Sequence, residues 1–151
     1  MALTAAAARA RYLAAGTGTA PRPRLLVLLY DRLILDLERA EAAFTPALPA
    51  TDGADRQEVG PGRERVTHAQ DILAALWSAL QTDEWDGGPT LAALYAHCLN
   101  QLSAAYVATD PGPVAECRAL LDPVRDAWRR AVEELARAEP VALPAGRGAG
   151  A

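Results

Sequence analysis

Apolar residues recur at intervals of three and four along most of the chain, which is the spacing of one buried face of an α-helix. Clusters of proline and glycine interrupt this pattern and mark the ends of the periodic segments. No segment alternates apolar and polar residues as a half-buried strand would. The pattern predicts four long amphipathic helices, at about 23–44, 63–81, 89–108 and 111–138.

Four amphipathic helices joined by mostly short turns must bury their apolar faces against one another. We therefore expect an all-α fold, an antiparallel four-helix bundle over residues 23–138, with a short extra N-terminal helix. Residues 1–22 form a separate N-terminal segment, 45–62 a flexible loop and 139–151 a disordered tail. Pro123 falls inside the last helix, where a proline removes a backbone hydrogen bond, so a bend is expected near 120–123.

Composition and charge limit the classes of partner that the protein could bind. The 151 residues carry a net charge of −4, and the arginines are interleaved with acids, so no basic face for nucleic acid is expected. No apolar run approaches the ~20 residues that a membrane-spanning helix needs, so we expect no membrane insertion and a cytoplasmic location. Cys98 and Cys117 lie in apolar helical patterns and are expected to be buried thiols.

The sequence offers no convincing catalytic or metal site. His68 and His97 are the only histidines, and the Glu-x-x-His spacing that holds metals in helical bundles is absent. The acids, Asp36 among them, mostly avoid the apolar stripes and are expected on a solvated face. We therefore expect no enzyme, no cofactor and no bound metal.

An acidic bundle without a visible site suggests a binding protein, and aromatic residues are the natural candidates for contact positions. Tyr30 and Trp128 are expected in the core. The stripe on the second helix is wider than one neighbouring helix needs. Such a face is either core or a groove for a partner helix, and the sequence leaves both open.

Four short motifs occur in order over Arg11–Leu135. The first combines Tyr12, Thr19-Ala20-Pro21 and a leucine-rich stretch ending in Leu29-Tyr30-Asp31. The others are Ala69-Gln70-Asp71-Ile72-Leu73, then Gly87-Gly88 followed by Leu94-Tyr95, and finally Arg125-Asp126-Ala127-Trp128. In this combination the chain resembles the flagellar export chaperone family, FliS.

The resemblance implies a chaperone that binds the disordered C-terminal segment of flagellin. It would prevent premature polymerisation and hand the subunit to the flagellar export gate. Tyr12 and Leu13 would be a displaceable cover over part of the binding groove. We expect the flagellin contacts on the second and third helices, at Leu73, Leu76, Trp77, Leu80, Leu99, Leu102, Tyr106 and Val107.

Two other functions stay open on the sequence. One is a helical dimerisation or adaptor module, a homodimer without a flagellin client. The other is a carboxylate metal enzyme built in the bundle core.

Overall fold

The computed structural model describes residues 23–46, 59–80 and 86–138, which form four helices. They are α2 (Pro23–Phe44), α3 (Val59–Ala79), α4 (Gly88–Ala108) and α5 (Pro111–Ala138). The described ranges contain no strand, so the all-α prediction is confirmed. The predicted N-terminal helix, most of the predicted loop and the predicted tail lie outside the described residues.

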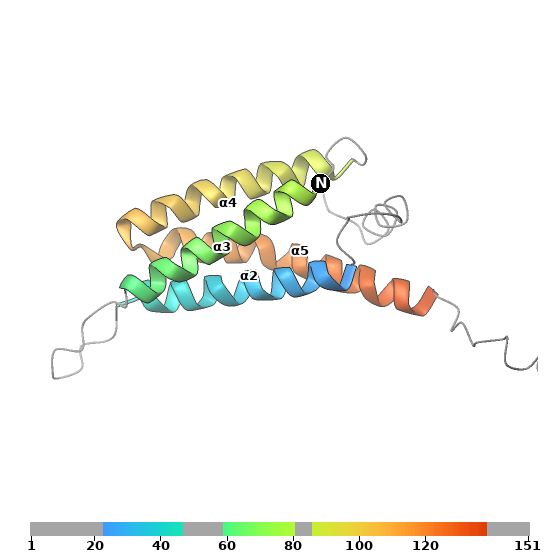
Figure 1. Cartoon of the computed structure of the whole chain (residues 1–151), viewed down its shortest axis with the longest axis horizontal. Helices are drawn as coiled ribbons and strands as arrows, with labels where there is room; N and C mark the ends of the chain where they lie inside the picture. Colours follow the sequence, from blue (N-terminus) through green and yellow to red (C-terminus); the bar gives the residue numbers. More distant parts are fainter. Residues whose placement is uncertain (1–22, 47–58, 81–85, 139–151) are drawn as a thin grey trace, which may run out of the picture.

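Consecutive helices run antiparallel, as predicted (Figure 1). α2 packs against α3 and α5, and α4 packs against the same two helices. α2 and α4 are therefore diagonal partners across the bundle. This arrangement lets each helix bury one apolar face, and it leaves four seams between neighbouring helices on the outside.

The turn from α4 into α5 is built from local signals. Thr109 has a left-handed backbone (φ 48°), and its N–H donates to the carbonyl oxygen of Ala105, which ends α4. The side chain of Asp110 then accepts a hydrogen bond from the N–H of Gly112 at 2.9 Å. Asp110 is thus the N-cap of α5, and Pro111 occupies its first turn. α5 continues as helix on both sides of Pro123, and the expected bend there stays a prediction.

α3 begins at Val59, earlier than predicted, so Gly60, Pro61 and Gly62 belong to its first turn. The prediction that these three residues belong to the flexible loop 45–62 was wrong. A proline fits the first turn because its missing N–H has no partner there anyway. Gly62 is buried against the ring of Phe44, and a Cβ at this position would lie 2.5 Å from Phe44 Cε1. The glycine therefore allows α3 to approach the end of α2 closely.

The core draws on all four helices, and Tyr30 and Trp128 are buried in it as predicted. Leu25 and Leu28, in the leucine-rich stretch of α2, are exposed although they recur at helical spacing with its buried residues. Both lie on the side of α2 that carries Arg32, at the outer edge of the contact with α3, where the stripe is wider than the contact. Fully buried side chains come from each helix, for example Leu33, Leu37, Leu73, Leu102, Val114 and Leu121.

One polar contact crosses the core between the diagonal helices. The hydroxyl groups of Tyr30 on α2 and Tyr95 on α4 form a buried hydrogen bond. Burial raises the pKa of Tyr95 to about 12, against a lowering effect of the hydrogen bond from Tyr30. The neutral pair is thus the form that fits the interior.

We expect Gly62→Ala to destabilise the fold by about 1–3 kcal/mol, because the new methyl group would overlap the Phe44 ring. Gly60→Ala is the matched control, since a Cβ there meets nothing within 4 Å. Urea denaturation followed by circular dichroism measures both. Equal stability of the two variants would contradict the proposed close approach.

The raised pKa of Tyr95 predicts a loss of stability in alkali. An unfolded tyrosine ionises near pH 10, whereas the folded Tyr95 holds its proton to about pH 12. Its contribution is fully present below pH 10 and is lost as the pH rises through 12, to a total of about 2–3 kcal/mol. Denaturation curves from pH 8 to 12 should show this decline, and Tyr95→Phe should flatten it. An equally steep decline in that variant would exclude Tyr95 as its cause.

Candidate partner-binding surface

The eight predicted contact residues fall into different environments. Val107 is 78% exposed, Tyr106 is 40% exposed and Trp77 is 39% exposed. Leu80 and Leu99 are partly buried and pack on the core. Tyr12 and Leu13, the predicted cover, lie outside the described residues.

The remaining three predicted contacts are core residues: Leu73, Leu76 and Leu102. They occupy the centre of the inward-facing stripes of α3 and α4, so in this conformation they hold the bundle together and do not face a partner. Of the predicted contact residues, those accessible to a partner are the exposed ones and the two at the edge of the core: Trp77, Tyr106, Val107, Leu80 and Leu99.

Helical spacing places the exposed aromatic residues on one surface. Arg63, Gln70 and Trp77 are each seven residues apart on α3, close to two full turns, so they share a face. Leu99 and Tyr106 are likewise seven residues apart on α4. The two rows meet along the outside of the contact between these helices.

Hydrogen bonds confirm that these rows face each other. Gln70 Nε2 donates to Ser103 Oγ at 3.1 Å, and Arg63 Nε donates to the carbonyl oxygen of Tyr106 at 2.9 Å. Ser103 Oγ in turn lies 3.0 Å from the carbonyl oxygen of Leu99. We call this surface the α3–α4 seam, defined by Arg63, Gln70, Trp77, Leu99, Ser103 and Tyr106.

The seam mixes apolar and polar groups. Trp77 lies seven residues beyond Gln70 on α3. Because α3 and α4 are antiparallel, this position is beside the N-terminal half of α4 (Figure 1). Ala92 and Ala96 of α4 fall on the side of the helix that carries Leu99 and Ser103. The seam therefore carries an exposed aromatic ring near each end, with the Gln70–Ser103 hydrogen bond between them.

Asp36 is the residue that sequence reasoning placed most wrongly. Its side chain is fully buried between α2 and α3, whereas a solvated position was expected. Its carboxylate accepts a hydrogen bond from Arg65 at 3.2 Å, contacts the His68 ring nitrogen Nδ1, and lies 3.4 Å from Arg32 Nε. The partners come from two helices, so only the assembled bundle compensates the buried charge. The sequence signal was slight, an acid beside the Leu33–Leu37 stripe.

A second contact between a histidine and a carboxylate lies between α4 and α5. His97 Nε2 is 2.9 Å from Glu116 Oε1, and Gln101 donates to the other oxygen of the same carboxylate. These hydrogen bonds, that from His97 first, lower the pKa of Glu116. The pair is solvent-exposed and acts as a surface contact between neighbouring helices.

Cys98 and Cys117 are buried, unbonded thiols, as predicted. Cys117 Sγ lies 3.6 Å from the carbonyl oxygen of Cys98. The hydrogen bond between the thiols and their burial raise the pKa of Cys117, while the same hydrogen bond lowers that of Cys98. The neutral thiols pack as small apolar groups between α4 and α5.

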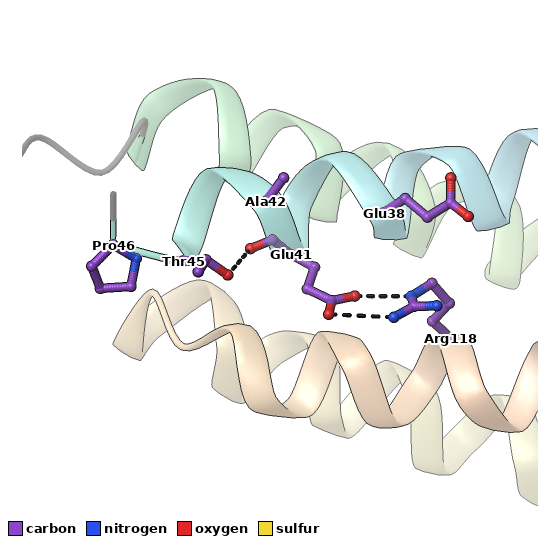
Figure 2. A pocket seen from close by; sticks show the side chains of 6 residues that line it. All are labelled: Glu38, Glu41, Ala42, Thr45, Pro46 and Arg118. Atoms are coloured by element: carbon purple, nitrogen blue, oxygen red, sulfur yellow. Dashed lines mark hydrogen bonds and ion pairs between the residues drawn. The ribbon is translucent and has the colours of Figure 1, made fainter. Parts of the chain in front are cut away.

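A surface hollow of about 650 Å³ lies away from the seam, at the end of α2 and alongside α5. Figure 2 shows Arg118 reaching from α5 to the carboxylate of Glu41, with Nε–Oε2 and Nη2–Oε1 distances of 2.8 and 3.3 Å. This contact raises the pKa of Arg118. None of the predicted contact residues lines the hollow, and two of its charged groups, Glu41 and Arg118, are paired with each other.

The described residues hold no group of three or more histidine, cysteine or acidic side chains arranged to bind a metal ion. None of the helices α2 to α5 combines the length and the apolarity that crossing a membrane requires.

We expect Asp36→Ala to cost about 2 kcal/mol of stability, because it removes a buried carboxylate and its hydrogen bonds. The loss stays moderate because Arg32, Arg65 and His68 are partly exposed and regain water. Glu38→Ala, at an exposed position of the same helix, is the control and should stay within about 0.5 kcal/mol of the parent. Chemical denaturation at pH 7 compares the two variants. If Asp36→Ala leaves the free energy of unfolding unchanged, the contacts of Asp36 with Arg32, Arg65 and His68 do not stabilise the fold.

No curated protein matches the chain in a sequence search. The family model for the flagellar protein FliS matches residues 4–135, a range that includes all four helices up to the last turn of α5. The sequence resemblance is therefore confirmed over most of the chain. With its helical bundle and its match to this model, the chain belongs to the FliS family of flagellar chaperones.

Proposed function

We propose that this protein binds the C-terminal segment of flagellin in the cytoplasm and that the α3–α4 seam is part of the binding surface. The observation that supports this most is the exposure of two aromatic side chains, Trp77 and Tyr106, on one seam of the bundle. Exposed aromatic residues are the type most enriched among strong contacts at protein interfaces. Membership of a chaperone family supports a protein client for this surface.

The dimensions of the seam suit a helical or extended segment. Arg63, which contacts Tyr106, and Trp77 are fourteen residues apart on α3, or ~21 Å along the helix axis. A client helix of about fourteen residues would cover this length. Leu80 and Val107 would extend the contact beyond its two ends.

The physics of a disordered client also favours such a surface. A segment that folds as it binds loses conformational entropy, and burial of apolar area must compensate for it. A seam with aromatic rings at both ends provides that area. Its polar groups, Gln70 and Ser103, are already hydrogen-bonded to each other and can be covered at little cost.

Several consequences belong to the same proposal. A flagellin C-terminal segment held on the seam is unavailable for polymerisation, and the complex is the form presented to the export gate. Tyr12 and Leu13 would cover part of the surface when no flagellin is bound.

We expect Trp77→Ala and Tyr106→Ala each to weaken binding of a flagellin C-terminal peptide by about 1–3 kcal/mol, because each removes an aromatic contact. Leu120→Ala is the matched control, since Leu120 is 39% exposed but lies on α5. Isothermal titration calorimetry with the full chain measures all three, and circular dichroism verifies the fold.

Unchanged affinity in both aromatic variants, with the fold intact, would place the site elsewhere. Light scattering separates the proposal from the dimerisation module. A chaperone should form a one-to-one complex with the peptide, whereas a dimer that ignores the peptide would rule out the flagellin-binding function.

A further inference from the structure

Arg63 makes three contacts with the last turn of α4, although it belongs to α3. Its Nε donates to the carbonyl oxygen of Tyr106 at 2.9 Å, and its Nη2 lies 3.4 Å from the carbonyl oxygen of Val107. Its guanidinium carbon also lies 5.1 Å from the centre of the Tyr106 ring. One side chain thus contacts the backbone and the aromatic ring of the same residue.

The end of α4 explains why these contacts matter. The last four carbonyl groups of a helix have no donor within the helix, and a cation near them is favourable. The N–H of Thr109 satisfies Ala105, but the last turn of α4 contains no basic residue of its own. Arg63 therefore supplies from the neighbouring helix the positive charge and the donors that α4 lacks.

The same contacts constrain the Tyr106 ring. An exposed tyrosine on the last turn of a helix would otherwise sample several rotamers, and ordering such a side chain on binding costs about 0.5–1.5 kcal/mol. The guanidinium over one face of the ring limits this freedom before any partner arrives. The ring's other face and edge remain for contact, next to Val107.

We propose that Arg63 is a positioning residue for partner binding: it holds the Tyr106 ring and the C-terminal turn of α4 in the arrangement that receives the flagellin segment. This inference rests on the proposed function. It assigns Arg63, itself a residue of the α3–α4 seam, an effect that acts through Tyr106 and does not depend on a direct contact between Arg63 and the partner.

The chemistry requires arginine at this position. A guanidinium is planar and presents several donors in a fixed fork, so it can hydrogen-bond two carbonyl groups while lying over a ring. A lysine ammonium is a point charge that can keep the favourable charge but not the combined geometry. Arg63→Lys should therefore fail to restore what Arg63→Ala removes.

The test is calorimetric titration of the full-length chain with a flagellin C-terminal peptide. We expect Arg63→Lys and Arg63→Ala to raise the Kd by about three- to tenfold. Arg65→Lys is the matched control, the same substitution two residues away on the side that faces α2 through Asp36, and its Kd should stay within twofold. Hydrogen exchange should also become faster at the amides of the last turn of α4 in both Arg63 variants only.

A double variant separates positioning from direct contact. If Arg63 acts through Tyr106, then Arg63→Ala combined with Tyr106→Ala should bind no more weakly than Tyr106→Ala alone. Fully additive losses would show that Arg63 affects binding independently of Tyr106 and would overturn the positioning role. Wild-type binding with an unchanged Kd in both Arg63 variants would overturn this inference alone. Absence of wild-type binding would overturn the proposed function and the inference together.

Discussion

Mutual burial of four apolar stripes is the constraint on which the rest of this structure depends. Helices of this length gain most of their stability in proteins from packing of an amphipathic face, because an isolated helix has a costly nucleus and marginal stability in water. Here the stripes of neighbouring antiparallel helices close on one another around side chains such as Leu37, Leu73 and Leu121, which are fully buried. The close approach of α3 to α2 at Gly62 follows from this packing. So does the exposure of the Trp77 and Tyr106 rings, which lie outside the packed stripes.

Polar contacts between helices specify which faces meet. Asp36 joins α2 to α3, Arg118 joins α5 to α2, and His97 joins α4 to α5, each through a partner on the adjacent helix. The Tyr30–Tyr95 hydroxyl pair adds a link between the diagonal helices. The surface pairs, Arg118–Glu41 and His97–Glu116, each contribute little stability. A buried carboxylate differs, because its charge is tolerated only when the correct neighbours are in place.

The α3–α4 seam shows how a well-packed bundle can still present a binding surface. The core uses the centre of each stripe, and the residues at the edge of the stripes stay at the surface, where Trp77 and Tyr106 retain about 40% of their exposure. A seam of this kind belongs to two helices at once, so its shape depends on their relative position. Contacts such as that of Arg63 with the end of α4 therefore affect the surface as well as the stability of the bundle.

The sequence by itself determined the helices, because apolar periodicity, prolines and caps are local signals. α2 spans Pro23–Phe44 as expected, and Asp110 caps α5. The tertiary structure alone decided which apolar residues are core and which are surface, because periodicity gives the direction of a stripe but not how much of its width the neighbours cover. Leu76 and Trp77 are adjacent in sequence, yet one is buried and the other exposed. Asp36 follows the same logic, since the cations that make its burial tolerable lie partly on another helix and reach it only after folding.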